Sequence, residues 1–555
     1  MSSDRLIYLP LGGAGEIGMN AYVYGYGPEN EERLILVDLG VTFSDMDTSP
    51  GVDLIFPDLT WLIENKDRLE AVFITHGHED HVGAVGHFWE KLGVPVYARA
   101  FTAALARHKM TDRGLSEQDV HTVSAWPETT KAGPFNVGFL PVSHSIPESA
   151  ALVIDTPEGR VIHSGDFKLD ENPVVGEPFD PDLWAEVSKD GVKALICDST
   201  NVFSMTPGRS ESSVGPEIEK LIVDAPYMVA ATTFASNVAR VKTLAEAGER
   251  AGRSICLMGR AMRRMIEAAI QTGVLNSFPK VVSPEDARAI PRENLMLIVT
   301  GSQGERRAAT AQLARGKYNG ITMKEGDTFL FSSKTIPGNE RGVIRIMNQF
   351  SEMGVDIVDD AGGLYHVSGH ANRPDLETLQ DIVKPQMVIP NHGEHRHLRA
   401  HAKLSQERGR ASIVAVNGTM VDLSGDDPVV CGFVETGRTY LDGAVKIGAL
   451  DGIVRDRIRM ALNGHLVVTV ILDEDDEPLG EAWCEIKGLP EQGRSFAPLL
   501  DVLEEDLTQF LGRASEKTLS NDDKLEEELR RIARNTCNDE IGKKPEVTVI
   551  VSRMS

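Results

Sequence analysis

The stretch THGHEDH, residues 75–81, follows directly on the apolar run LEAVFI at residues 69–74. Three imidazoles and two carboxylates therefore fall within six residues at the end of a predicted strand. Imidazole nitrogen and carboxylate oxygen bind zinc tightly. His76 and His78 lie on either side of Gly77 and can reach one ion. Asp80 and His81 begin the next turn and face the position of an adjacent ion. A solvated polar loop is the alternative interpretation. We predict four metal ligands here: His76, His78, Asp80 and His81.

A polar residue follows an apolar run at three later places in the chain. The runs cover residues 136–143, 160–165 and 386–391 and end in turns of small residues. Each leads to one side chain able to bind metal: His144, Asp166 and His392. Sites in layered α/β proteins are assembled at the carboxyl ends of strands. Taken singly, each residue could equally be a hydrogen-bonded histidine or a turn aspartate; together with the first stretch they form a consistent ligand set.

The pattern of apolar runs divides the chain into domains. Residues 1–212 alternate short β-rich runs with few helices, and residues 366–450 return to this pattern. Between them, residues 213–365 alternate compact buried strands with longer helices, which predicts a parallel, doubly wound sheet inserted into the first domain. The predicted strands are 227–231, 254–258, 295–299 and 328–331, and the predicted helices include 238–252 and 260–272.

The C-terminal part is predicted to be a small α+β domain, residues 465–555, after a linker at 451–464. Its strands are predicted at 465–472 and 546–552, and its helices at about 498–514 and 521–536. The first helix carries an apolar stripe at helical spacing, which we expect to pack on the domain's own sheet. The stripe consists of Leu499, Leu500, Leu503 and Leu507.

Composition agrees with a multidomain protein of the reducing cytoplasm. The 555 residues are 41% hydrophobic, enough for several cores. No apolar run reaches the length of a membrane span, and the first residues lack the features of a signal peptide. The five cysteines are scattered and form no CxxC pair, which argues against disulfides and thiolate zinc.

Two sequence features resemble functional motifs without meeting their requirements. Residues 13–18, GAGEIG, match the dinucleotide fingerprint, but residues 19–27 predict a strand where the fingerprint needs a helix. We therefore predict a hairpin there. His395, His397 and His401 lie on the predicted helix after His392, and we expect them to be solvated or to support the ligands rather than to bind metal.

Longer strings resemble a known family. The ligand set resembles the metallo-β-lactamase superfamily, and its nucleic-acid-processing β-CASP branch adds an acidic strand end and two late histidines: here Asp198, His370 and His392. Five strings are similar to the ribonuclease J family: GGAGEIGMN from Gly12, GVDLIFPDL from Gly51, TGSQGE from Thr300, IPGNE from Ile336 and NHGE from Asn391. The chain departs from the pattern at Asn372-Arg373 and at Arg306.

The resemblance implies a fold and a metal site. The fold is an αββα metallo-β-lactamase sandwich with an inserted doubly wound β-CASP domain and a small C-terminal α+β domain. By resemblance, His76, His78, His144 and Asp166 hold one zinc ion, and Asp80, His81, Asp166 and His392 hold a second, with Asp166 bridging. Manganese or magnesium are alternative metals. Two such ions lower the pKa of water and neutralise the attacked phosphoryl group. The residues assigned to catalysis are Asp80, His81, Asp198 and His370.

The resemblance also implies the substrate. Ribonuclease J-like enzymes degrade single-stranded RNA from its 5′ end, prefer a 5′-monophosphate, can also cut internally, and act in mRNA decay and rRNA maturation. Family members form homodimers or homotetramers, and no membrane is involved. The residues expected to grip substrate are His366, Val367, Ser368, Gly369 and His370, together with Phe234, Ser236 and Asn237.

The net charge of −26 is unusual for an RNA-binding protein, since Lys and Arg usually contact phosphates. Residues 232–320, however, hold 14 Lys and Arg against 7 Asp and Glu. We predict that some of these cations line a channel, with ordinary helix-surface charges as the alternative. The candidates are Arg240, Lys242, Arg260, Arg263, Arg264, Arg306 and Arg307.

Two other functions compete with a ribonuclease. A small-molecule metallohydrolase of the same superfamily would not need the insert of about 150 residues or the late histidines. A catalytically silent scaffold that binds RNA would be expected to have lost metal ligands, whereas all seven positions are filled here.

Overall fold

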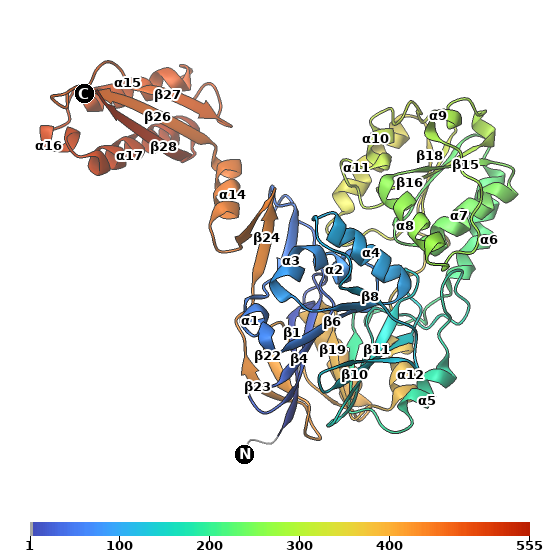
Figure 1. The fold of residues 1–555 in the computed structure, drawn as a ribbon. Coiled ribbons are helices and arrows are strands. Elements are labelled where there is room, and N and C mark those ends of the chain that lie inside the picture. Colours follow the sequence, from blue (N-terminus) through green and yellow to red (C-terminus); the bar gives the residue numbers. More distant parts are fainter. Residues whose placement is uncertain (1–3, 555) are drawn as a thin grey trace. The chain divides into compact units, whose positions relative to one another are not determined.

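The computed structural model describes residues 4–554, which form two compact units (Figure 1). Unit 1 contains the residues up to Thr42 and Phe56–Arg438, and unit 2 contains Phe43–Ile55 and the residues from Thr439 on. Among the described residues, no helix has the length and apolar character needed to cross a bilayer.

Unit 1 contains two large mixed sheets that share one core. The first has the order β23 (Val429–Phe433), β22 (Thr419–Asp422), β1 (Arg5–Gly12), β3 (Ala21–Gly27), β4 (Arg33–Val37), β6 (Leu69–Ile74), β7 (Val96–Ala98) and β8 (Val120–Thr122). The second has the order β21 (Ala411–Ser412), β19 (Met387–Asn391), β13 (Ala194–Asp198), β12 (Gly159–His163), β11 (Ala150–Thr156), β10 (Phe135–Pro141) and β9 (Thr129–Ala132).

Side chains from both sheets fill the space between them. Tyr8 and Phe73 of the first sheet and Phe139 and Ile196 of the second belong to one buried cluster. The other face of the second sheet packs against the apolar sides of three helices, through residues such as Trp184. These helices are α5 (Pro181–Ser188), α12 (Arg373–Val383) and α13 (His395–Glu407). Helices α3 (Val85–Leu92) and α4 (Ala100–Thr111) belong to the first half of the sandwich. The predicted αββα sandwich is confirmed.

The inserted sheet is fully parallel, with the order β15 (Ser254–Met258), β16 (Leu295–Val299), β14 (Val229–Thr232), β17 (Thr328–Phe331) and β18 (Asp356–Val358). One face packs on α6 (Gly215–Asp224), α7 (Val238–Arg250) and α8 (Arg260–Gln271). The other packs on α9 (Pro284–Ala287), α10 (Ala309–Ala314) and α11 (Glu340–Glu352). Helices on both faces make the sheet doubly wound, as predicted.

The glycine-rich stretch after β1 forms a turn and not a nucleotide loop. β1 and β3 pair antiparallel across it, which confirms the predicted hairpin. Within the turn, β2 (Ala14–Gly15) pairs with β20 (Gly393–Glu394). This pairing places the turn beside His392.

Unit 2 contains the hairpin β24 (Arg438–Asp442) and β25 (Val445–Gly448) and a three-stranded sheet with helices. The sheet has the order β27 (Trp483–Lys487), β26 (His465–Leu472) and β28 (Glu546–Arg553). It packs on α15 (Leu499–Leu511) and α17 (Asp522–Ile541), and Leu499, Leu503 and Leu507 are buried in this core, as expected. The segment predicted as a linker is not an extended connection, because most of it forms α14 (Ile453–Asn463).

Candidate active site

The site begins where β6 ends. After the buried residue Ile74, the chain turns through Thr75 and His76, and the short helix α2 (Glu79–Val82) follows. Asp38, at the end of β4, holds this turn: it accepts hydrogen bonds from the Thr75 main-chain N–H at 2.8 Å and from the Thr75 hydroxyl. A buried carboxylate between two parallel strands thereby fixes the direction in which the histidines leave the sheet.

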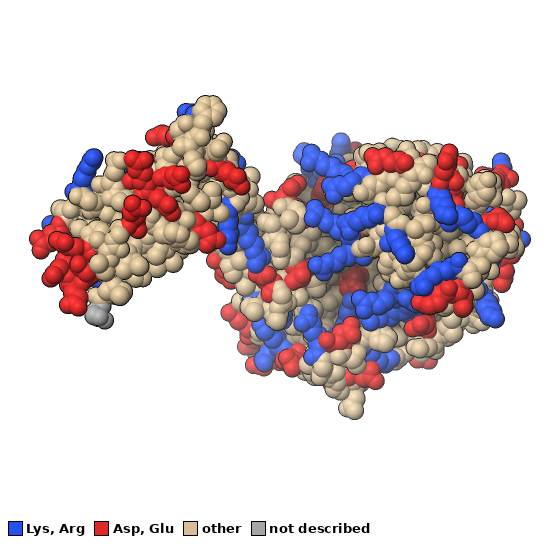
Figure 2. Space-filling model, turned by 90° about the horizontal axis from the view of Figure 1, so that it is seen from above, with Lys and Arg blue, Asp and Glu red and all other residues tan. Residues whose placement is uncertain are grey.

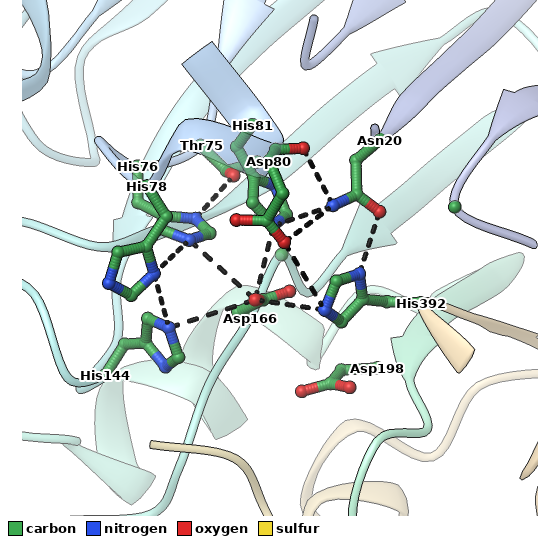
Figure 3. A network of polar contacts seen from close by, with 12 residues as sticks. Asn20, Thr75, His76, His78, Asp80, His81, His144, Asp166, Asp198 and His392 are labelled. Atoms are coloured by element: carbon green, nitrogen blue, oxygen red, sulfur yellow. Dashed lines mark hydrogen bonds and ion pairs between the residues drawn. The ribbon is translucent and has the colours of Figure 1, made fainter. Parts of the chain in front are cut away.

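Seven side chains from distant parts of the chain meet at this point (Figure 3). One of two four-residue groups consists of His76, His78, His144 and Asp166, and the other of Asp80, His81, Asp166 and His392; Asp166 also lies in a third, three-residue group with Asp198 and His370. Within each group, the potential ligand atoms lie within 4.8 Å of one another. All seven predicted ligand positions are thus brought together, and Asp166 lies in both four-residue groups.

The separations within the groups suit metal ions. Four atoms that each lie about 2 Å from one tetrahedral zinc ion are roughly 3.3 Å apart. Asp166 Oδ2 lies 3.2 Å from His81 Nε2, 3.3 Å from His392 Nε2 and 3.8 Å from the Nε2 atoms of His76 and His144. The second oxygen of this carboxylate is buried and has no hydrogen-bond partner among the described residues. A buried, unpaired carboxylate oxygen is costly unless a cation compensates it, so the donor set fits a divalent metal site.

The rings present their lone pairs to the centre of the cluster. His81 Nδ1 lies 2.7 Å from Asp38 Oδ2, and His144 Nδ1 lies 2.6 Å from the Gly369 carbonyl oxygen. Both partners only accept hydrogen bonds, so the proton of each neutral ring sits on Nδ1 and Nε2 faces the cluster. A Cβ at Gly369 would lie 2.6 Å from Ser145 Oγ and 2.8 Å from the His144 ring, so a larger residue there would displace these side chains.

Electrostatics favour the metal-binding forms of His76, His78, His144 and Asp166, but not that of His81. Burial lowers the pKa of His76 and His144 well below the usual value and that of His78 to about 4, so these rings are neutral. Burial opposes ionisation of Asp166, but the positive charge that His392 and His81 carry when protonated outweighs it and holds the pKa of Asp166 well below its usual value. Burial also opposes protonation of His81, but the carboxylates of Asp166, Asp80 and Asp38 raise the pKa of His81 well above its usual value, so this ring must give up a proton when an ion binds.

A further acid–histidine pair adjoins the cluster. His370 Nδ1 lies 2.7 Å from Asp198 Oδ2, and the His370 ring lies 5.1 Å from the His144 ring, centre to centre. Burial alone would lower the pKa of His370, but the charge and hydrogen bond of Asp198, aided by Asp166 and Asp80, raise it to about 9. His370 is 22% exposed and Asp80 31%, whereas Asp166 is 3% exposed, so the cluster faces solvent on the side of His370 and Asp80.

The residues expected to grip substrate lie in two segments, 366–370 and 234–237. In the first segment, Ser368 Oγ accepts hydrogen bonds from the His370 N–H and from Asn201, while Val367 is buried in the core of the insert. In the second, Phe234 and Ser236 are half-buried, and Asn237 is buried and caps α7 by accepting from the Arg240 N–H. Arg240, three residues after the second segment, donates from its guanidinium to the Tyr365 carbonyl oxygen, directly before the first segment.

The prediction that Arg240 lines a channel is wrong. Its side chain is fully buried and forms an ion pair with Glu211 at 2.7 Å. Lys242 pairs with Glu246 at 3.7 Å. The remaining candidates are exposed: Arg260, Arg263, Arg264, Arg306 and Arg307. Figure 2 shows Lys and Arg side chains gathered around a hollow on one face of unit 1.

Three residues that contact the ligands or organise the site were missed. Asp38 obeys the rule that located the ligands, a polar residue directly after an apolar strand. Asn20 ends the string GGAGEIGMN, in which no local pattern marks it as a partner of metal ligands. Glu211 carries no local signal, since its role depends on a partner 29 residues away. His395 is exposed, His397 is buried, and His401 is buried against Ser199, so none joins the metal ligands.

Comparisons with known proteins decide the family. Four family models match: Metallo-beta-lactamase superfamily (residues 15–197), Ribonuclease J, beta-CASP domain (227–350), Zn-dependent metallo-hydrolase RNA specificity domain (364–416) and Ribonuclease J C-terminal domain (452–554). Ribonuclease J of Sinorhizobium meliloti is 40% identical over 99% of this chain and 98% of its own length. The chain belongs to the ribonuclease J family.

Other relatives agree. Ribonuclease J of Mycolicibacterium smegmatis is 36% identical over 90% of this chain and 89% of its own, and that of Thermus thermophilus is 32% identical over 85% and 83%. A solved structure of a protein of unknown function from Enterococcus faecalis shares the fold, with a TM-score of 0.52 and 15% identity over 75% of this chain and 100% of its own.

Family membership distinguishes a ribonuclease from a small-molecule metallohydrolase and from a catalytically silent scaffold. The chain is a metal-dependent ribonuclease, and its RNA specificity domain implies RNA binding. The resemblance noted in the sequence is therefore confirmed.

Proposed function

We propose that the chain is a zinc-dependent 5′-to-3′ exoribonuclease that prefers 5′-monophosphorylated single-stranded RNA, also cuts internally, and acts in mRNA decay and rRNA maturation in the cytoplasm. Homodimers or homotetramers are the proposed assemblies. The observation that carries the proposal is the pair of ligand groups that share Asp166. When two zinc ions are bound there, they lower the pKa of water and neutralise charge on the attacked phosphoryl group.

The proposed ligands divide the work between the two groups. His76, His78 and His144 provide only nitrogen to one ion, apart from the shared Asp166. Asp80, His81 and His392 complete the other group, and Asp80 is the most exposed of these ligands. Its side of the cluster is therefore where a phosphodiester is proposed to enter. Asp80 and His81 act in catalysis through this group.

Asp198 and His370 are proposed to handle the leaving group. Asp198 accepts the Nδ1 proton of His370, which leaves Nε2 free to donate to the scissile phosphate or to the leaving 3′-oxygen. Asn201 donates to Ser368 Oγ at 2.7 Å and to the His370 carbonyl oxygen at 3.2 Å. These bonds hold the turn that presents His370.

The preference for a 5′-monophosphate is supported by the surroundings of His366. Its Nδ1 is buried and has no hydrogen-bond partner among the described residues. Burial, with the positive charges of Arg240, Lys334, Lys168 and Arg209, lowers the pKa of His366 to about 3. Arg240 and Lys168 are already paired with Glu211 and Asp170, so the exposed side chains of Lys334 and Arg209 are the cations proposed to meet a phosphate beside this ring. Ser368, Gly369, Phe234, Ser236 and Asn237 are proposed to complete the grip.

The proposal is tested with two variants and a control. Asp80→Ala is expected to lose bound metal and activity, whereas His370→Ala is expected to keep its metal and lose about 10²- to 10⁴-fold in rate. His395→Ala, on an exposed neighbouring position, is expected to behave like the wild type. Zinc content is measured by elemental analysis. Products from 5′-monophosphate and 5′-triphosphate RNA are separated by size, and mononucleotides are expected to form faster from the first.

The result that contradicts the proposal is equally specific. Normal cleavage by both Asp80→Ala and His370→Ala would show that the site is elsewhere. Equal rates on the two RNAs would disprove the 5′-monophosphate preference alone.

A further inference from the structure

Asn20 contacts residues on both sides of the second ligand group. It lies just before β3, fully buried, at the end of the glycine-rich turn. Its side chain contacts Asp80 and His81, about 60 residues away in sequence, and His392, which is 372 residues away. Three of the four ligands proposed for one ion therefore meet a single carboxamide (Figure 3).

The orientation of the Asn20 amide is fixed by an acceptor that cannot donate. Nδ2 lies 2.9 Å from the Asp80 main-chain oxygen, so this end of the amide must carry the hydrogens. The same nitrogen lies 3.3 Å from Asp80 Oδ2 and 3.0 Å from His81 Nε2. The Asn20 main-chain N–H also donates to the Asp80 oxygen at 2.9 Å, so two donors of one residue hold the Asp80 peptide.

The opposite end of the amide determines which ring nitrogen of neutral His392 carries the proton. Asn20 Oδ1 accepts a hydrogen bond from the Tyr22 hydroxyl at 2.6 Å and lies 2.8 Å from His392 Nδ1. Because Oδ1 only accepts, the proton of the neutral His392 ring sits on Nδ1. Nε2 then turns its lone pair towards Asp166 Oδ2, 3.3 Å away. His392 also has a φ of 44°, a left-handed backbone conformation that is uncommon for residues other than glycine.

We propose that Asn20 is a positioning residue for one of the two metal ions: it orients His392 and Asp80 and thereby determines the affinity of the Asp80–His81–Asp166–His392 group. The inference rests on the proposed two-ion function. The other group has no contact with this amide in the described network, because its rings are held by Thr75 and by the Gly369 carbonyl oxygen. Loss of the Asn20 side chain is therefore expected to affect the two ions unequally. Partners that orient metal ligands typically change metal affinity by about 10- to 100-fold.

Zinc titration of the full chain against a chromophoric chelator gives the stoichiometry and both dissociation constants. In Asn20→Ala, one ion is expected to bind about 10- to 100-fold more weakly and the other as in the wild type. Tyr22→Phe removes only the hydroxyl that holds Asn20 Oδ1, and it is expected to weaken binding of the same ion by a smaller factor. Asn417→Ala is the matched control: this asparagine binds the same turn through Ala14 and Glu16 but contacts no ligand, and both ions are expected to bind normally.

Double variants assign the weakened ion. Combined with His392→Ala, Asn20→Ala is expected to add little, because the same ion is already lost. Combined with His78→Ala, it is expected to impair both ions. Equal weakening of both ions in Asn20→Ala, or unchanged binding of both, would overturn the inference. Should Asn20→Ala not fold, unchanged binding in Tyr22→Phe would do the same. A wild-type chain that binds fewer than two ions would instead disprove the proposed function, independently of any variant.

Discussion

The buried ion pair between Arg240 and Glu211 permits a quantitative test of how the insert is fastened to the sandwich. The guanidinium contacts both Glu211 carboxylate oxygens, at 2.7 and 3.0 Å. It also donates to the Ser332 hydroxyl at 2.9 Å and to the Tyr365 carbonyl oxygen at 2.8 Å. Glu211 lies where the chain enters the insert, and Tyr365 lies where the chain leaves it. The Arg240 side chain therefore connects the two segments that join the insert to the sandwich.

Arg240→Met removes the cation and leaves a carboxylate that is only 5% exposed without a partner. Breaking a buried pair on one side in this way costs about 3–5 kcal/mol. In the double variant with Glu211→Met no charge remains buried, and the loss is expected to fall to about 1–3 kcal/mol for the hydrogen bonds that are not replaced.

Urea unfolding followed by tryptophan fluorescence measures these differences, since Trp184 lies in the core of the sandwich. Zinc content is expected to stay unchanged, because neither residue contacts a ligand. A loss below about 1 kcal/mol in Arg240→Met would refute the view that the pair fastens the insert. A double variant less stable than Arg240→Met would also refute this view, because the unpaired charge of Glu211 would then not be the cause of the lost stability.

Three further outcomes follow from the structure. Burial lowers the pKa of His401 to about 4, so the stability that depends on its neutral ring is complete above pH 6.5 and is lost as the pH falls from 6.5 towards 4. Between these pH values, the free energy of unfolding of His401→Gln is expected to fall by roughly 3 kcal/mol less than that of the wild type. The same pH dependence in both proteins would contradict this assignment. In Gly369→Ala the new methyl group meets the His144 ring, so zinc titration should show weaker binding of one ion, and normal binding would contradict the close approach. If Arg263 and Arg306 each contact an RNA phosphate, their joint replacement by Ala lowers the slope of log affinity against log salt by about 1.4 in filter binding; an unchanged slope would place the RNA elsewhere.

Much of the fold was predictable because its pattern is local. Each strand of the insert is a short apolar run, and β15, β16 and β17 begin and end as predicted. The hairpin around the glycines followed from the apolar run after them, which excludes the helix that a nucleotide loop requires. β18 was missed because its three residues are not fully buried and give little apolar signal.

The ligands could be located because each follows a strand directly. Parallel strands bring their carboxyl ends to one edge of a sheet, so the positions of His144, Asp166 and His392 in sequence carry information about space. The residues that orient them could not be found in this way. Asn20 acts on partners about 60 and 372 residues away, and only the tertiary fold brings them together.

Arg240 shows how a charge can mislead. Its positive charge in a basic region suggested contact with RNA, yet it lies on the buried side of α7 beside Val241 and Leu244. A buried arginine requires a buried acid, and no local pattern identifies Glu211 as that acid. The prediction that Arg240 is exposed to RNA was wrong because its ion-pair partner, Glu211, lies on a different element.

The most direct test of the account is the metal dependence of RNA cleavage by the purified chain. Bound metal is counted by elemental analysis before and after dialysis against a chelator, and each sample is given 5′-monophosphate RNA. We expect two ions per chain, no cleavage after their removal, and recovery of both metal and activity on adding zinc. A chain that still degrades RNA after complete removal of metal would contradict it.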